Sequence, residues 1–412
     1  MRSMRLGSCV AMGLVLTLGT MVCAAAAEGE WASWQGPTLD AKSPDKGLLK
    51  EWPEGGPKLL WKLDGIGKGF STVAVSGGII YTTGDTDDKK LMIFAFDMDG
   101  KPLWKVEHGA AWTGDHPGSR ATPTISEGKM YLFSGVGLIG CYDAKTGEKK
   151  WTHQAKEFGG SWHGWGYAES VLIQGKLALV TPGGQNCIVA LDKDTGQTVW
   201  MSKGFTAPPN YGSIMPFTFE GVPLLVAGTG GGLVCVDART GEVQWSNSFC
   251  KGNVANCPTP AYADGYVFWS NGYGKGAICM KLKKVGNKVD ADVAWTTKDM
   301  VCHHGGYIID NGYIYGNHNA GWTCLELKTG QKKWSEKGVG KGSVTYADGM
   351  LYLFGENGGQ AGLAAFTPEG MQMKGQLKVA GEGPSWAHPV VIGGRLYLRY
   401  DTNLYCFDVK AK

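Results

Sequence analysis

Short stretches of alternating apolar and polar residues recur along the chain, and each follows a two-residue turn. Eight of them succeed one another from Ser76 to Asp401, with the sequences SGGIIYTTG, EGKMYLFSG, QGKLALVTP, EGVPLLVAG, DGYVFWSNG, NGYIYGNHN, DGMLYLFGE and GGRLYLRYD. Alternation with a period of two is the pattern of a strand, and the turn before it predicts a hairpin. The pattern therefore predicts eight units built from short strands.

Most of these units close with a turn followed by Trp. The clearest endings are DAKTGEKKW, DKDTGQTVW, DARTGEVQW and LKTGQKKW, and looser copies end at Trp104 and Trp295. A repeat of about 40–50 residues made only of strands is typical of a β-propeller. We therefore predict an all-β, eight-bladed β-propeller. We expect the Asp and Thr of DxxTG to bond the turn backbone and the Trp to cover the junction between blades.

The two ends of the chain complete one blade between them. The last unit stops at NLYCFDVKAK without the TGxxxW ending, and an extra strand, KLLWKLDG around Trp61, precedes the first unit. We expect this N-terminal strand to close the ring. The predicted domains are a signal peptide over 1–27, an extended arm over 28–58 that lies on the propeller, and the propeller itself over 59–412.

The first 27 residues have the pattern of an export signal. Arg2 and Arg5 precede the apolar stretch VAMGLVLTLG, and Ala25–Ala27 fit a cleavage site before Glu28. The apolar stretch is too short to span a membrane convincingly. We therefore predict cleavage near Ala27, a periplasmic or extracellular protein, and no transmembrane segment in the mature chain.

Cysteines recur at one strand position of the repeat, as in GLIGCYD, GLVCVD and NLYCFD. We expect these thiols to be buried and free, because free Cys packs as a small apolar side chain. They are Cys141, Cys187, Cys235, Cys279, Cys324 and Cys406. Cys250 and Cys257 instead flank the loop CKGNVANC, and in an oxidising compartment they are candidates for a disulfide.

The TGxxxW endings and the xxCxD strand together resemble the repeat of the PQQ-like, quinoprotein-type β-propellers over residues 59–409. The segment from Trp31 to Trp61 is similar to the arm of exported PQQ-like propellers of planctomycete-type bacteria, which usually carry Arg where this chain has Gln35. The resemblance implies one of two functions. Quinoprotein dehydrogenases hold pyrroloquinoline quinone (PQQ) and Ca²⁺ at the centre of the ring, whereas BamB-like scaffold propellers bind proteins and hold no cofactor.

The sequence departs from both groups. It has no Cys-Cys pair and no Asp-rich stretch of the dehydrogenases, and its loops are short; the lipobox of BamB-like lipoproteins is missing as well. For Ca²⁺, the central segments offer only Glu169 as a carboxylate, with Asn210 and Asn256. The formal net charge of +3 gives no electrostatic basis for a nucleic-acid partner.

These departures favour a non-enzymatic binding or scaffold module that takes a protein or glycan-type ligand through its central face. The alternative is a PQQ-dependent periplasmic dehydrogenase of alcohols or sugars. We assign no cofactor, because the motifs that hold PQQ with calcium in the dehydrogenases are absent.

The candidate site comes from the segment before the innermost strand of each blade, since these segments line the channel of a propeller. Several are rich in aromatic, His and Arg side chains, which can stack and orient a planar or sugar-like ligand. The candidates are Phe70, Arg120, Trp162, His163, Trp165, Tyr167, Glu169, Tyr211, His303, His304, Trp386 and His388. Two alternatives stay open: these residues surround a water-filled channel mouth, or they form a protein-binding surface.

We predict no metal site among the candidate histidines. Neutral imidazoles are good transition-metal ligands, but His163, His303 and His388 come from different blades. Adjacent residues of a strand point to opposite faces, so His303 and His304 are not expected to bind one ion together.

Overall fold

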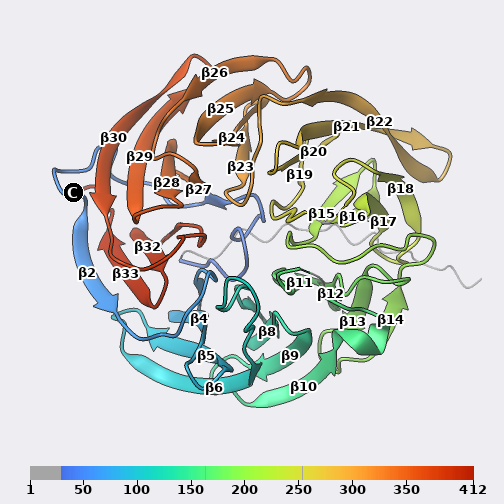
Figure 1. The fold of residues 1–412 in the computed structure, drawn as a ribbon, viewed down its shortest axis with the longest axis horizontal. Coiled ribbons are helices and arrows are strands. Elements are labelled where there is room, and N and C mark those ends of the chain that lie inside the picture. Colours follow the sequence, from blue (N-terminus) through green and yellow to red (C-terminus); the bar gives the residue numbers. More distant parts are fainter. Residues whose placement is uncertain (1–28, 163, 253) are drawn as a thin grey trace, which may run out of the picture.

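The computed structural model describes residues 29–162, 164–252 and 254–412. They form eight antiparallel sheets set around a central axis, which confirms the predicted eight-bladed propeller (Figure 1). In blades 1 to 7, strands that follow one another in the sequence pair as neighbours from the innermost strand to the rim, and in blade 8 the outermost strand comes from the N-terminal end of the ring. The predicted signal peptide over 1–27 and the candidate His163 lie outside the described residues.

The first four blades run from the innermost strand outwards as follows. Blade 1 contains β3 (Ala74–Ser76), β4 (Ile79–Asp85), β5 (Lys90–Asp97) and β6 (Pro102–Ala110). Blade 2 contains β7 (Thr124–Ser126), β8 (Lys129–Phe133), β9 (Leu138–Asp143) and β10 (Lys149–Gln154). Blade 3 contains β11 (Leu172–Gln174), β12 (Leu177–Val180), β13 (Val189–Asp192) and β14 (Thr198–Met201). Blade 4 contains β15 (Met215–Phe219), β16 (Val222–Thr229), β17 (Gly232–Asp237) and β18 (Val243–Asn247).

The other four blades follow the same order. Blade 5 contains β19 (Ala261–Ala263), β20 (Tyr266–Asn271), β21 (Gly276–Val285) and β22 (Lys288–Thr297). Blade 6 contains β23 (Tyr307–Asp310), β24 (Tyr313–His318), β25 (Gly321–Glu326) and β26 (Lys332–Glu336). Blade 7 contains β27 (Gly342–Ala347), β28 (Met350–Gly355), β29 (Gln360–Thr367) and β30 (Gly370–Lys378). Blade 8 contains β31 (Val390–Ile392), β32 (Arg395–Tyr400), β33 (Asn403–Asp408) and β2 (Lys58–Leu63).

The N-terminal strand closes the ring as predicted. Strand β2 pairs antiparallel with β33, and Trp61 lies opposite Cys406. Because the first strand of the propeller completes the blade that the last strands begin, the two ends of the ring are held by backbone hydrogen bonds.

The recurrent Trp and Gly of the repeat meet across the blade junctions. Trp295 of blade 5 donates its indole N–H to the Leu327 carbonyl of blade 6 at 2.9 Å. Gly330, in the turn after Leu327, has φ +72°, and a Cβ added there would lie 2.6 Å from Cδ2 of Trp295. Trp151 makes the same contact with the next blade, donating to the Lys193 carbonyl at 3.0 Å. The Trp of one blade therefore covers the junction with the next, as predicted, and the TG turn of the next blade leaves room for it.

The segment before β2 lies against the propeller and crosses the centre of the ring (blue in Figure 1). Trp31 is buried and forms a β-bridge with Val75 of the innermost strand of blade 1. The short strand β1 (Lys42–Ser43) pairs in parallel with β27. This path brings Trp34 beneath the central axis, where its indole N–H donates to the Thr259 hydroxyl at 3.3 Å.

Helix is nearly absent from the part of the chain that the structure describes. It contains one 3₁₀ turn, η1 (Ala155–Phe158), which follows β10. None of the described helical residues forms a segment long and apolar enough to cross a membrane.

The cysteines separate into two groups. All six predicted as buried free thiols are so. Five of them lie on the third strand of their blade, but Cys187 precedes β13, where Ala190 takes the recurrent position opposite Trp200. Cys250 and Cys257 are also free thiols, so the disulfide expected from their loop is not formed in this structure. The two side chains lie in different surroundings: Cys250 packs in the core between blades 4 and 5, whereas Cys257 lines a pocket on the central axis.

Candidate functional site

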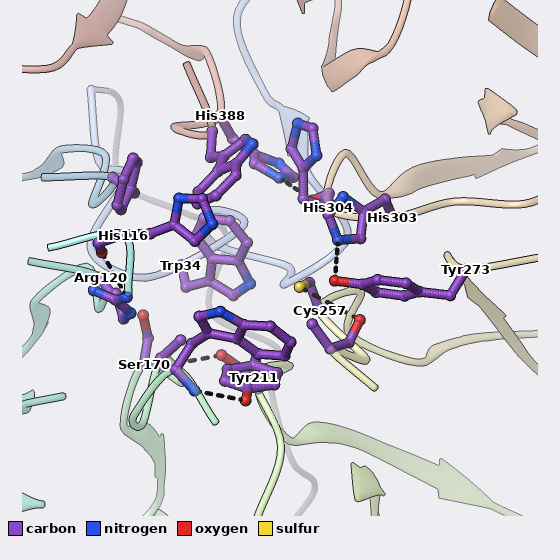
Figure 2. Close-up of a pocket in the computed structure, with 16 residues that line it drawn as sticks. Trp34, His116, Arg120, Ser170, Tyr211, Cys257, Tyr273, His303, His304 and His388 are labelled. Carbon is purple, nitrogen blue, oxygen red and sulfur yellow. Dashed lines mark hydrogen bonds between the residues drawn. The ribbon is translucent and has the colours of Figure 1, made fainter. Parts of the chain in front are cut away.

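A pocket opens on the axis of the ring, where the segments before the innermost strands converge (Figure 2). The cavity itself has a volume of about 190 Å³, and the space including its open mouth is about 990 Å³. Its wall contains most of the candidate residues chosen from the sequence, namely Phe70, Arg120, Trp165, Tyr211, His303, His304, Trp386 and His388. A concave, largely apolar cavity with a few convergent polar groups is the usual form of a small-molecule site.

Aromatic rings form the walls and the floor of this pocket. Phe70 and Trp386 lie side by side, with ring centroids 4.7 Å apart. Trp165 and Tyr211 stand on the blade 3 and blade 4 side, 6.0 Å apart. Trp34, from the arm, closes the floor with its ring 4.6 Å from that of His388. Stacking surfaces therefore face the lumen from several blades.

Arg120 supplies the positive charge of the wall. Its guanidinium donates to the carbonyl oxygens of Gly118, Asp115 and His116 at 2.5, 3.2 and 2.8 Å. Among the described residues, no carboxylate lies close enough to form an ion pair with it. Burial lowers the Arg120 pKa to about 10, so the group stays cationic at neutral pH. The partly buried guanidinium is held by carbonyl oxygens and lies over the rings of Phe70 and Trp112, 5.8 and 5.5 Å from their centroids, so none of the described anions neutralises its charge toward the pocket.

The carboxyl with the largest electrostatic influence on Arg120 belongs to Asp85, which does not line the pocket. Asp85 is buried, and burial raises its pKa to about 7 in spite of the opposing effects of Arg120 and Arg399. Arg399 is 1% exposed and donates to the Ser71 hydroxyl at 2.7 Å and to the Gly67 carbonyl at 3.0 Å. Since Asp85 is only partly ionised near pH 7, this region keeps a net positive charge.

A polar group lies at the blade 6 and blade 7 side of the pocket. The Lys341 ammonium donates to His303 Nδ1 at 2.8 Å and to Glu356 Oε1 at 2.9 Å. The Trp386 indole N–H donates to the same Glu356 oxygen at 2.7 Å. Because His303 Nδ1 accepts from an ammonium, the ring proton lies on Nε2, which donates to the Tyr273 hydroxyl at 3.2 Å.

His304 and His388 are buried next to this group. His388 Nε2 donates to the His304 carbonyl at 3.0 Å, whereas His388 Nδ1 and both ring nitrogens of His304 have no hydrogen-bond partner among the described residues. Burial lowers the pKa of His388 to about 4 and that of His304 well below its usual value. Both rings are therefore neutral at physiological pH.

Three candidates from blade 3 do not line the pocket. Tyr167 is buried and donates to the Pro182 carbonyl at 2.9 Å. Glu169 is buried and accepts from the backbone N–H and hydroxyl of Thr181, and Trp162 is exposed at the rim. Gly166, with φ +79°, interrupts the alternation of this segment. After it, Ala168 and Ser170 line the pocket, whereas the alternate residues Tyr167 and Glu169 do not.

Other residues of the site were missed by the sequence analysis. Tyr273 and Glu356 lie between the second and third strands of their blades, in loops that reach the same face as the segments chosen. Including those loops would have identified both. No feature of the sequence pointed to Trp34, because it lies in the N-terminal arm and the repeat does not determine the path of that arm.

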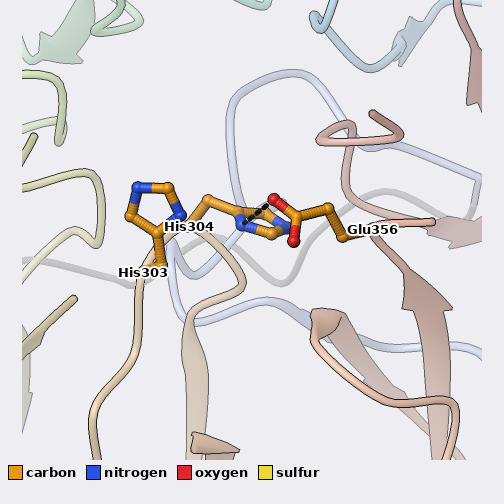
Figure 3. Close-up of side chains that lie close together, drawn as sticks. All are labelled: His303, His304 and Glu356. Carbon is orange, nitrogen blue, oxygen red and sulfur yellow. Dashed lines mark ion pairs between the residues drawn. The ribbon is translucent and has the colours of Figure 1, made fainter. Parts of the chain in front are cut away.

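The premise that strand alternation separates the side chains of His303 and His304 is wrong, whereas the expectation that they do not bind one ion together stays a prediction. The two residues lie in a bend before β23 and not in a strand, so strand alternation does not separate their side chains. One ligand atom each of His303, His304 and Glu356 lies within 4.8 Å of the others (Figure 3).

The pocket does not suit a quinone–calcium pair. Ca²⁺ prefers six to eight oxygen ligands, yet none of the described residues that line the pocket carries a carboxylate, and Glu356 is engaged by Lys341 and Trp386. Glu169 points into blade 3. Asn210 accepts the backbone N–H groups of Tyr211 and Asn256 through its oxygen. Imidazole and guanidinium groups predominate where oxygen ligands would be needed.

Comparison with known proteins gives one family and several similar structures. A family model described as outer membrane protein assembly factor BamB matches residues 52–203 and 89–336. Quinoprotein alcohol dehydrogenase PedH of Pseudomonas putida is 26% identical over 254 residues, which are 57% of this chain and 38% of that protein. The curated relatives matched are thus much longer than this chain.

Among solved structures, BamB from Moraxella catarrhalis has a TM-score of 0.59 and 14% identity, covering 86% of this chain and 98% of that one. Quinohemoprotein alcohol dehydrogenase from Comamonas testosteroni has a TM-score of 0.52 and 13% identity, covering 93% and 81%. At these identities the likeness concerns the fold alone.

Proposed function

The chain belongs to the family of PQQ-like propellers described as outer membrane protein assembly factor BamB, and from that membership we propose that it is an exported binding module. Its ligand site is the central pocket. The ligand is a small molecule, or the tip of a glycan, with a flat or ring-shaped body and an anionic group. The aromatic pocket beside an unpaired Arg120 is the observation that carries this proposal.

The ring-shaped body follows from the aromatic walls. Trp34, Phe70, Trp165, Tyr211 and Trp386 present their rings around one cavity. Such rings stack on planar molecules and on the apolar face of sugars, and they lose little conformational entropy when they bind.

The anionic group follows from the charge of the wall. Among the described residues that line the cavity, Arg120 carries the one formal charge, and none is Asp or Glu. A carboxylate or sulfate on the ligand would form a charge-assisted hydrogen bond with the guanidinium, which is the strongest polar contact available there. A uronic acid combines this group with a ring.

Export is part of the same proposal. The basic and apolar start of the chain, followed by Ala25–Ala27, has the pattern of a cleavable signal. An exported propeller of this kind would meet glycans and small acids outside the cytoplasm, where its free thiols stay protected because most are buried.

Isothermal titration calorimetry tests the ligand class. The probes are D-glucuronate, benzoate and D-glucose, titrated into the purified protein. We expect the acids to bind and neutral glucose to bind at least about tenfold more weakly, since a hydrogen bond to a charged group contributes roughly 1.5–3 kcal/mol. Equal affinity for glucose and glucuronate, or no heat with any probe, would refute the proposal.

Two Arg variants provide the matched control. Arg120→Gln should weaken the binding of the acids by about ten- to a hundredfold. Arg239→Gln removes an Arg that is 63% exposed on the outer part of blade 4 and paired with Asp237. It should leave the affinity unchanged.

The dehydrogenase alternative has a separate test. It is favoured by the match to PedH and disfavoured by the shortage of oxygen ligands in the pocket. Addition of PQQ with Ca²⁺ should give neither a bound-quinone absorbance after gel filtration nor dye-linked oxidation of alcohols or sugars. Stoichiometric retention of the quinone together with such oxidation would replace the binding-module proposal.

A further inference from the structure

His303, His304 and Glu356 lie close together, and an ammonium binds two of the three. Lys341 Nζ lies 2.8 Å from His303 Nδ1 and 2.9 Å from Glu356 Oε1. The three ligand atoms come from the bend before β23 and the loop after β28, on two neighbouring blades (Figure 3). A cation is therefore already favoured at this point of the molecule.

The Lys341 ammonium leaves the ring nitrogens of His304 without a hydrogen-bond partner. The residue is 9% exposed, and neither ring nitrogen has a hydrogen-bond partner among the described residues. Its Nδ1 lies 3.9 Å from Glu356 Oε1, which is too far for a hydrogen bond. Buried polar atoms nearly always have a hydrogen-bond partner. His304 Nδ1 has none and is therefore free to bind an additional group.

The ligand set points to a transition metal. Two imidazoles and one carboxylate suit Zn²⁺ and similar divalent ions, whereas Ca²⁺ and Mg²⁺ prefer oxygen. His303 Nδ1 accepts a hydrogen bond from the Lys341 ammonium and so presents a lone pair that an ion could use once the ammonium leaves.

Lys341 is placed so that it can leave. It lies between Gly340 and Gly342, and its side chain is 28% exposed, so rotation about its own bonds can carry the ammonium to solvent. Metal–nitrogen bonds are about 2.0–2.1 Å. An ion at the ammonium position would then need His303 and Glu356 to approach by less than about 1 Å, and Glu356 would keep a cationic partner.

We propose that His303, His304 and Glu356 form a binding site for a divalent transition-metal ion, and that the Lys341 ammonium competes with the ion for this site. The inference does not depend on the organic ligand proposed above. It makes a prediction that an adventitious surface site would not: removing one particular lysine should tighten metal binding.

Calorimetric titration with ZnCl₂ alone tests the competition. In Lys341→Met, which keeps a chain of similar length without the charge, we expect one Zn²⁺ per protein with an affinity at least about tenfold above that of the parent. The ion no longer has to replace two charge-assisted hydrogen bonds. Lys341→Arg keeps a cation and should bind no more tightly than the parent.

His304→Gln in the Lys341→Met background should weaken Zn²⁺ binding at least about a hundredfold, because it removes one of three protein ligands. His153→Gln removes a surface His that is paired with Glu157 and should change nothing. Thermal unfolding of every variant shows whether it folds, and Glu356→Gln is a second ligand variant if His304→Gln does not. Absence of stoichiometric binding in Lys341→Met, or binding that survives loss of His304 and Glu356, would overturn the proposal.

Discussion

The contact between each TG turn and the preceding Trp predicts a stability effect that one substitution can isolate. Gly330 has φ +72°, and an added Cβ would lie 2.6 Å from Cδ2 of Trp295. Gly128 has almost the same φ, +73°, and nothing within 4 Å of an added Cβ. Gly330→Ala and Gly128→Ala therefore share the cost of the backbone conformation and differ in the steric contact.

The expected magnitudes follow from these two contributions. A non-Gly residue in the left-handed region costs roughly 1–2 kcal/mol, and overpacking costs typically about 1–3 kcal/mol more. Gly128→Ala should therefore lower the free energy of unfolding by about 1–2 kcal/mol, and Gly330→Ala by about 2–5 kcal/mol. In a protein that already carries Trp295→Leu, Gly330→Ala should lower the free energy of unfolding only by as much as Gly128→Ala does in the parent.

Equilibrium urea unfolding followed by far-ultraviolet circular dichroism measures these differences, and the four proteins of the Gly330–Trp295 cycle give the coupling free energy directly. Thermal midpoints provide an independent ranking. If Gly330→Ala costs no more than Gly128→Ala, or if its cost is unaffected by loss of the Trp295 ring, then the glycine of the repeat is not needed for the junction between blades.

Three further predictions concern the core, the pocket floor and a blade junction. Burial lowers the pKa of His108 to about 4 from the ordinary 6.5, so the unfolded chain binds more protons between these values. The free energy of unfolding of the parent should therefore rise by up to about 3 kcal/mol relative to His108→Gln between pH 4 and 6.5, and the difference should stay constant above pH 6.5. Urea unfolding of both proteins at each pH measures this difference. Trp34→Ala should weaken the binding of the acid probes by about tenfold in calorimetry, because it removes the aromatic floor; an unchanged affinity would place the ligand elsewhere. Trp334→Phe removes the 2.8 Å hydrogen bond to the Thr367 carbonyl and should cost at least about 1 kcal/mol of unfolding free energy, whereas a cost near zero would show that this bond does not stabilise the junction.

The repeat made the architecture predictable in some detail. The number of blades, the closure at Trp61 and the junction role of the Trp residues all follow from a pattern that recurs along the sequence. Each feature depends on short-range spacing or on the equivalence of the blades. The disulfide was a weaker expectation, because the closeness of Cys250 and Cys257 in sequence says nothing about the blade structure between them.

The site was predictable only in part, because its geometry depends on contacts between distant segments. Arg120, Trp165 and Trp386 were found since they precede innermost strands. Glu169 was misplaced because Gly166 changes which residues face the axis. Lys341 and Glu356 meet His303 only when blades 6 and 7 lie side by side, and Trp34 reaches the axis through an arm whose path no periodicity describes.

The most direct test of the ligand proposal is a crystal structure of the protein grown with the acid that binds most tightly in calorimetry. We predict the ring of the ligand over Trp34, within the wall formed by Phe70, Trp165 and Trp386, and its anionic group within hydrogen-bonding distance of Arg120. Density for the ligand at the outer rim of the blades, with only water in the central pocket, would contradict it.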